Sequence, residues 1–254
     1  RWPTPANRRA RASGTALDAV VERIIAQRRA APEPGHDLLG LLLAARDEDG
    51  GGLSDTEIRN EVMTLFLAGH ETTANLLTFL LLEFARHPDM QARARAEVRA
   101  VLGTRDPDAA DARNLPYVNA CIQEALRLYP PAWIVPRQST EPVTVAGYEL
   151  PAGTNVSVNI FLLQRNPLDW PHPDVFDPQR WLPGTRTPDA FMPFGAGARM
   201  CIGNHLALLE ATLITALLLR DLAFDVPDGG PSGLNAGVTL KPGGPVNSRI
   251  TCVE

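Results

Sequence analysis

The sequence predicts a mainly α-helical protein with small β-sheets, and three observations support this fold class. Of the 254 residues, 44% are hydrophobic, which is enough for one packed core. Apolar residues recur at helical spacing along most of the chain, and the longest such stretch, 55–86, contains no proline. Alternation typical of strands is confined to 142–160 and the C-terminal tail. We expect residues 1–254 to form a single domain.

The charge and cysteine content exclude several classes of protein. The net charge is -5, with 24 basic and 29 acidic residues and no dominant block of either sign, so we expect no nucleic-acid partner. The three cysteines contain no C-x-x-C pair, which favours a reducing compartment over a disulfide scaffold. The longest apolar run, 206–219, is interrupted by Glu210, so we expect no membrane segment. We also expect no signal peptide at the start of the chain.

The first two predicted helices precede the long central stretch. Apolar residues at spacings of three and four predict a helix over 13–30, after an irregular entry at Pro3 and Pro5. Asp37 is a suitable N-cap for a leucine-rich helix that ends near Arg46.

The central helix is predicted over about 55–86. Ser54 followed three residues later by Glu57 is a capping box at its start. At 1.5 Å per residue such a helix is about 48 Å long, which is enough to cross a domain. The next helix is expected to open at Pro88 and close at Gly103.

The rest of the chain changes from helix to strand and back. A helix over about 115–129 ends before two prolines, and the alternating region 142–160 follows it. Residues 164–200 are rich in Pro, Gly and aromatic residues and have no clear period, which predicts a long ordered loop of the kind retained for function. A final long helix is expected after Gly203, and then short strands.

The end of the long loop carries the strongest chemical signal. Its distinctive residues are Phe194, Gly195, Gly197, Arg199, Cys201 and Gly203. A helix N-terminus beside Cys201 stabilises a thiolate, which is a soft ligand suited to iron. The three glycines allow positive φ and a close approach to a flat ligand, while Arg199 can pair with a carboxylate. A buried structural cysteine on a glycine loop is the alternative.

A polar stretch, 68–73, interrupts the middle of the central helix. It contains His-Glu, but Ala74 occupies the position where a zinc-protease helix has its second histidine. A mid-helix threonine can bond to the carbonyl four residues earlier and loosen the helix. Glu71 beside Thr72 places a carboxylic acid next to an alcohol, which can form a proton relay.

The loop pattern F-x-x-G-x-R-x-C-x-G resembles the haem-binding signature of the cytochrome P-450 family, the haem-thiolate monooxygenases. The resemblance implies a cytochrome P-450 fold and haem b (iron protoporphyrin IX), with Cys201 as the axial iron ligand. It also implies that Arg199 binds a haem propionate, that Phe194 packs beside the sulfur, and that the three glycines lie against the haem.

The polar stretch of the central helix is similar to the family pattern [AG]-G-x-[DE]-T-[TS]. The resemblance implies that Ala68 and Gly69 leave room above the iron. It further implies that Thr72 is the hydrogen-bond partner of bound oxygen and that Glu71 conducts protons.

Glu124 and Arg127 form an E-x-x-R pair that would face one side of a helix, which by itself is a weak signal of a surface ion pair. The family joins such a pair to a distant arginine in a buried network, and Arg180 matches that arginine. Gln179 and Trp181 replace the more usual Glu and Phe of this segment. We assign the network a structural role beneath the haem.

Arg137 lies where the family has a second propionate-binding arginine. Trp133 and Arg137 also mimic a W-x-x-x-R motif, but Pro136 between them argues against a helix, so we reject that match. The residues expected to line the substrate pocket are Trp133, Ile134, Val135 and, more weakly, Gly237 and Val238.

The resemblance implies a monooxygenase with O2 as co-substrate, a small apolar organic substrate, and a ferredoxin or flavodoxin type electron donor. It implies a bacterial-type soluble, cytoplasmic enzyme. Family members carry a further N-terminal region of similar size, and this chain begins at Arg1 rather than Met, so we expect that region to be absent. The alternative is a truncated, non-catalytic haem-binding remnant or half of a split protein.

Overall fold

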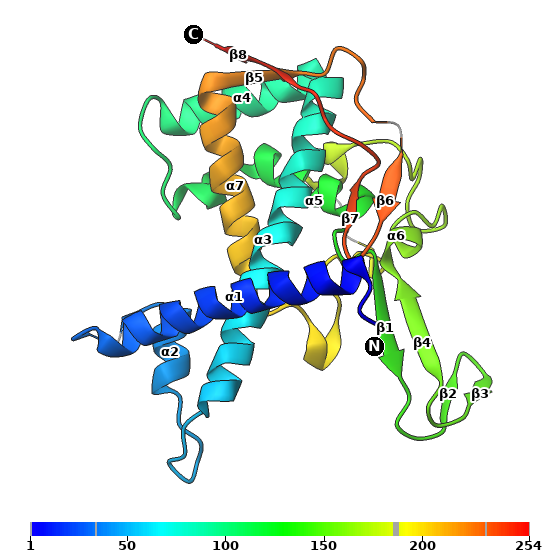
Figure 1. The fold of residues 1–254 in the computed structure, drawn as a ribbon. Helices are drawn as coiled ribbons and strands as arrows, with labels where there is room; N and C mark the ends of the chain where they lie inside the picture. The colour runs from blue at the N-terminus through cyan, green and yellow to red at the C-terminus, as the bar shows by residue number, and fades with distance from the viewer. Residues whose placement is uncertain (1, 34, 185–187, 232, 254) are drawn as a thin grey trace. The chain divides into compact units, whose positions relative to one another are not determined.

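The computed structural model describes residues 2–33, 35–184, 188–231 and 233–253. The protein is mostly helical with small antiparallel sheets, as the sequence predicts (Figure 1). The chain separates into two compact units, residues 1–70 and 71–254, which are described in turn. The central helix α3, Asp55–Arg86, begins in the first unit and ends in the second.

The first unit opens with helix α1, Pro5–Ala30, which begins earlier than the sequence predicts. The Thr4 hydroxyl accepts a hydrogen bond of 3.2 Å from the Asn7 amide and so caps the helix. Pro5 is the first helical residue, where a backbone N–H has no partner in any case. The expected irregular entry at Pro5 is therefore wrong, because proline is favoured at this position.

Side-chain caps start the next two helices, as predicted. Asp37 accepts from the Gly40 amide at 3.0 Å and caps α2, Leu38–Ala44. The capping box of α3 is complete: the Glu57 amide donates to the Ser54 hydroxyl at 3.3 Å, and the Ser54 amide donates to Glu57 Oε2 at 2.8 Å. The local sequence thus fixes where these helices begin.

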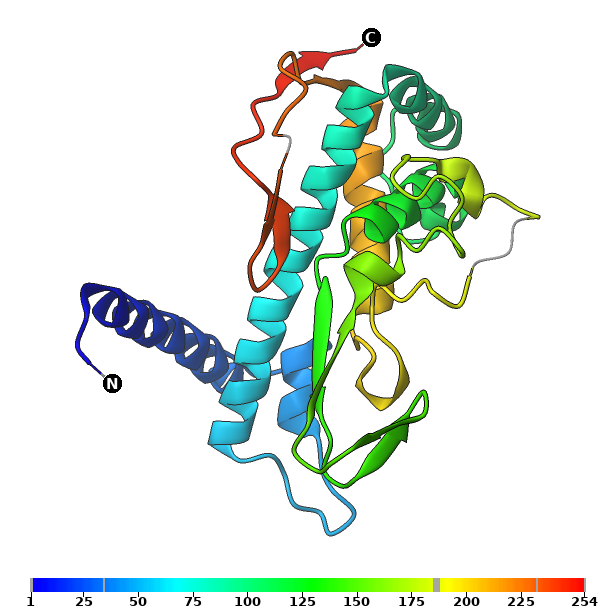
Figure 2. The same ribbon diagram turned by 90° about the vertical axis from the view of Figure 1, so that its right-hand side faces the viewer.

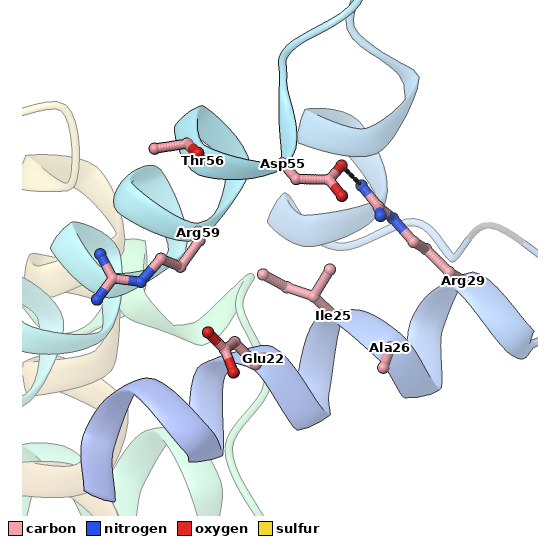
Figure 3. Close-up of a pocket in the computed structure, with 7 residues that line it drawn as sticks. All are labelled: Glu22, Ile25, Ala26, Arg29, Asp55, Thr56 and Arg59. Atoms are coloured by element: carbon pink, nitrogen blue, oxygen red, sulfur yellow. Dashed lines mark hydrogen bonds and ion pairs between the residues drawn. The ribbon is translucent and has the colours of Figure 1, made fainter. Parts of the chain in front are cut away.

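A small apolar cluster, in which Val21, Ile25, Leu39 and Ile58 are buried, holds the first unit together. Figure 3 shows a hollow beside it, of about 400 Å³, between α1 and the first turns of α3. The Arg29–Asp55 ion pair of 2.6 Å spans its rim, and both side chains are exposed. Solvent screens such a pair, so the hollow has no strong polar anchor for a ligand.

The second unit is built around one core formed by the later turns of α3 and by three further helices. These are α4, Pro88–Leu102; α5, Pro116–Leu128; and α7, Asn204–Asp221. A 3₁₀ turn, Asp111–Asn114, precedes α5. Leu80 and Phe84 of α3, Ile122 of α5 and Leu219 of α7 are all fully buried in this core. Helix α5 is buried around most of its circumference, as a helix at the centre of a bundle must be.

Among the described residues, α3 is the one helix long and apolar enough to cross a membrane by length and composition. The apolar run 206–219, on which the expected absence of a membrane segment rests, lies in α7 and not in this helix. Leu76, Leu80 and Phe84 of α3 are buried in the core of the second unit. Core packing therefore explains these three apolar positions, while 28% of the most apolar window of the helix is buried.

The strands pair as four two-stranded antiparallel sheets. The pairs are β1 (Ile134–Gln138) with β4 (Asn155–Asn159), β2 (Val143–Val145) with β3 (Tyr148–Leu150), β5 (Leu222–Asp225) with β8 (Arg249–Cys252), and β6 (Leu234–Ala236) with β7 (Leu240–Pro242). The sequence predicts β2 to β4 and the C-terminal strands but not β1, because Pro136 lies within it opposite Ser157.

The segment between α6 (Ile160–Leu163) and α7 is the predicted long loop. Its described residues form only short 3₁₀ turns, η2 (Pro178–Trp181) and η3 (Gly197–Arg199). It returns the chain to the start of α7, where Cys201 lies.

Candidate functional site

The cysteine loop is closed by its own backbone. The Cys201 amide donates to the Phe194 carbonyl at 2.9 Å, and the Met200 amide donates to the Gly197 carbonyl at 3.0 Å. Helix α7 begins at Asn204, three residues after the cysteine. The loop therefore holds Cys201 just ahead of a helix N-terminus, and its thiol is exposed rather than packed.

Two of the three glycines have the backbone conformation that the sequence predicts. Gly195 and Gly197 both have φ of 71°, which disfavours any residue with a Cβ. A Cβ at either position would have no atom within 4 Å, so the loop is open beside them. Gly203 has φ of -89°, and the expectation of positive φ there is wrong, because it serves as the N-cap of α7.

The two arginines expected to bind propionates are both exposed. Arg199 ends the turn η3, and Arg137 lies on β1, where its guanidinium donates to the neighbouring Pro136 carbonyl at 2.8 Å. Within the described part of the chain, neither arginine forms an ion pair with a carboxylate. Figures 1 and 2 both place the loop of 194–203 beside β1. The two guanidinium groups thus lie on neighbouring segments of the same unit.

The polar stretch of α3 remains α-helical throughout, so the expected loosening does not appear as a break. Ala68 and Gly69 belong to the first unit and are exposed. Glu71 and Thr72 begin the second unit and are half-buried. Glu71 forms an ion pair with Lys241 of β7, a partner that the sequence analysis did not identify.

One of the expected pocket residues, Trp133, contacts the turn between β6 and β7. The Trp133 indole donates to the Gly237 carbonyl at 3.0 Å. Ile134 and Val135 are half-buried at the start of β1. Val238, at the tip of the turn, is 96% exposed. The structure therefore brings two distant segments together that the sequence analysis assigned to one pocket.

The predicted structural network is present with direct contacts. Arg127 donates to both carboxylate oxygens of Glu124 at 2.8 Å, and both side chains are fully buried. Arg180 approaches the same carboxylate at 3.3 Å. Trp181, noted only as a departure from the family pattern, donates its indole N–H to Glu124 at 2.9 Å. The Asp177 amide also donates to Glu124 at 2.9 Å, so two cations and two neutral donors compensate the carboxylate.

The network also fastens the long loop. Arg127 donates to the carbonyls of Gln164, Pro173 and Val175 at 3.0, 2.6 and 3.1 Å. Gln164 in turn donates to the carbonyls of Leu126 and Arg127, both at 3.0 Å, and accepts from the Met192 amide at 3.0 Å. A fully buried glutamine thus joins α5 to the approach of the cysteine loop.

Sequence reasoning missed Gln164 and Lys241 for the same reason. Each acts through partners far away in the sequence, and neither lies in a motif. The signal that could have identified Gln164 is its place at the end of an apolar turn, because a buried polar side chain needs hydrogen-bond partners.

The loop presents donor chemistry that fits haem. Cys201 offers an exposed thiol for a soft metal, and the two positive-φ glycines leave open space beside it for a flat ring. Arg137 and Arg199 suit carboxylate groups at the edge of such a ring. The apolar side chains of Ile202 and Leu206 are exposed near the thiol along the chain, where a ring could cover them.

Comparison with known proteins agrees with this chemistry. The profile of the family described as "Cytochrome P450" matches residues 1–245. The mainly helical fold and the cysteine loop ahead of α7 agree with that match. The chain is a member of the cytochrome P-450 family.

The similar proteins include two from Streptomyces. Cyclooctatin synthase of Streptomyces melanosporofaciens is 42% identical over 223 residues, which cover 86% of this chain and 49% of that protein. Pentalenene oxygenase of Streptomyces avermitilis is 42% identical over 222 residues, with coverages of 86% and 49%. The chain spans about half the length of the curated relatives it matches.

A solved structure supports the same fold. The crystal structure of the cytochrome P450DA heme domain superposes with a TM-score of 0.87 at 36% identity. The match covers 94% of this chain and 55% of that one. The fold is therefore that of the family, over the portion which this chain represents.

Proposed function

We propose that this chain is the haem-binding portion of a haem-thiolate monooxygenase. The observation that carries the proposal is the exposed Cys201 thiol on a loop opened by Gly195 and Gly197. When bound, haem b supplies the O2 chemistry in which RH, O2, two electrons and two protons give ROH and H2O. Cys201 would hold the haem iron through its thiolate, and Phe194 would pack beside the sulfur.

The remaining residues of the loop orient the cofactor. Arg199 and Arg137 bind the propionates, because each is an exposed guanidinium without a carboxylate partner in the described ranges. Gly195 and Gly197 let the backbone approach the ring, and Gly203 starts α7 behind the thiolate. Ala68 and Gly69, the small residues before Glu71, leave room at the haem, as the family resemblance implies.

Glu71 and Thr72 move protons in this proposal. They are consecutive residues of α3, so a carboxyl and a hydroxyl are available on the same helical turn. Glu71 collects a proton from solvent, to which it is partly exposed, and Thr72 passes it toward the oxygen being reduced.

The substrate and partners follow from the family and from the composition. A relative is named for the oxygenation of pentalenene, which supports a small apolar organic substrate. Trp133, Ile134, Val135, Gly237 and Val238 line its pocket. A ferredoxin or flavodoxin type protein supplies the electrons, and the acidic composition favours a cytoplasmic protein without a nucleic-acid partner.

The absorption spectrum of the reduced protein with carbon monoxide tests this function. A strongly red-shifted Soret band is expected in the wild type, with loss of the band in Cys201→Ser. A wild type that takes up no haem would contradict the proposal and support the non-catalytic alternative.

Thiol labelling gives a second test with a control inside the chain. Cys201 and Cys252 are both exposed, whereas Cys121 is buried and desolvation raises the pKa of its thiol. Added haem should protect Cys201 from alkylation and leave Cys252 reactive. Equal protection of both cysteines, or of neither, would contradict the ligand assignment.

The proton relay has its own variant. Thr72→Ala removes the hydroxyl. The yield of product per NAD(P)H should fall by about 10²-fold or less, and the diverted reducing equivalents should appear as peroxide. Thr72→Ser retains the hydroxyl and is the matched control. Unchanged hydroxylation in Thr72→Ala would show that Thr72 has no part in proton delivery.

A further inference from the structure

The hairpin of β6 and β7 is fastened to α3 by two polar contacts. Lys241 pairs with Glu71, and the Asn75 side-chain amide donates to the Thr239 hydroxyl at 3.1 Å. All four residues belong to the second unit, and Figures 1 and 2 show the hairpin alongside α3. These contacts join a strand to the helix that carries the proposed proton relay.

The spacing of the contacts shows that the strand follows the helix. Glu71 and Asn75 are four residues apart on α3, a rise of about 6 Å. Thr239 lies in the turn just before β7, and Lys241 lies within β7. Glu71 pairs with Lys241 and Asn75 with Thr239, so the chain from 239 to 241 runs opposite to the helix.

The other side of the hairpin is bound to the segment before β1. The Leu240 amide donates to the Pro131 carbonyl at 3.0 Å, and the Trp133 indole donates to the Gly237 carbonyl at 3.0 Å. Thr239 and Leu240 are buried, whereas Val238 at the tip is almost fully exposed. The hairpin is thus held on both sides of its turn, while the side chain of Val238 within the turn remains exposed.

The Glu71–Lys241 pair is suited to orienting a carboxylate without trapping it. The two side chains are 39% and 45% exposed, so solvent screens the attraction and the pair can open. The ion pair restricts the rotamers that the Glu71 carboxylate can adopt.

We propose that Lys241 is a positioning residue that holds the Glu71 carboxylate on the hairpin side of α3, and so couples the substrate-facing hairpin to proton delivery. This inference rests on the proposed function, because it assigns Glu71 to the proton relay. A ligand that contacts Val238 at the tip then acts on Glu71 through Lys241, which lies three residues after Val238 in the chain.

Amide hydrogen exchange tests the contact without relying on activity. In the haem-loaded protein, Lys241→Gln should speed the exchange of amides in 234–242 by about two- to fivefold, as expected for an exposed ion pair. Glu71→Gln should do the same, and the double variant should add nothing further, because both remove one interaction. Lys241→Arg should restore the wild-type rate.

Product yield per NAD(P)H and its solvent isotope effect test the positioning role. Lys241→Gln should lower the yield about two- to fivefold and change the isotope effect, and Lys241→Arg should restore both. Asn75→Ala is the matched control: it severs the neighbouring contact, so it should loosen the hairpin but leave the isotope effect unchanged.

Two results would overturn the inference. Unchanged exchange in Lys241→Gln would show that the ion pair does not hold the hairpin. Faster exchange with an unchanged isotope effect would show that the ion pair holds the hairpin but does not influence proton transfer. Failure of the proposed function itself is separable, since it appears as a missing red-shifted Soret band in the wild type.

Discussion

Arg127 holds the carboxylate of Glu124 through two hydrogen bonds of 2.8 Å, and no part of either side chain reaches solvent. The same guanidinium donates to three carbonyls of the long loop. One side chain therefore neutralises a buried charge and anchors the segment that leads to Cys201.

Replacement of Arg127 by alanine is expected to reduce the free energy of unfolding by about 3–5 kcal/mol, because it leaves Glu124 charged and buried. Arg180→Ala should cost less, since Arg180 is partly exposed and lies 3.3 Å from the carboxylate. Denaturant unfolding followed by circular dichroism measures both changes. Equal stability of Arg127→Ala and the wild type would contradict the role of this pair.

Gln164→Leu is expected to destabilise the protein by about 1–3 kcal/mol for each buried backbone group left without a partner. The substitution removes the donors to Leu126 and Arg127 and the acceptor for the Met192 amide. Gln164→Glu keeps the acceptor and should leave Met192 protected from hydrogen exchange. If both variants exposed Met192 equally, the glutamine would not be its anchor.

Gly195→Ala and Gly197→Ala should each cost about 1 kcal/mol or more of unfolding free energy, because alanine is disfavoured at φ of 71°. No atom lies near enough to clash, so the cost is one of backbone conformation. Gly203→Ser is the control, since φ there is -89° and serine is a good N-cap. Thermal unfolding of the three variants compares them, and a greater loss for Gly203→Ser would refute this account.

Acid should weaken the turn before α5. Hydrogen bonds from Arg105 and from the Asp108 amide lower the pKa of Asp111 to about 2, from 3.8. A lowered pKa in the folded state gives stability that is present above pH 4 and is lost as the pH falls toward 2. The pH dependence of unfolding should therefore be shallower in Asp111→Asn between pH 4 and 2. An identical slope would show that Asp111 does not contribute.

Local features of the sequence were sufficient for several elements. The Ser54–Glu57 capping box and the absence of proline set the start and length of α3. Proline and glycine boundaries located α4 and α5, Gly203 marked the start of α7, and the spacing of Phe194, Gly197 and Cys201 identified the family. The start of α1 was missed because Pro5 was taken as a helix breaker rather than as a first helical residue.

The contacts that join distant segments were decided only by the tertiary structure. Gln164 with Met192, Trp181 with Glu124 and Lys241 with Glu71 are separated by 28, 57 and 170 residues. Strand β1 was missed for a related reason, since Pro136 is tolerated because β1 is an edge strand of a two-stranded sheet. By itself the sequence determined the helices, the cysteine loop and the family, because caps, periodicity and motifs act between near neighbours. The tertiary structure decided which side chains share a carboxylate or a carbonyl, because such partners are fixed by the packing of the whole unit.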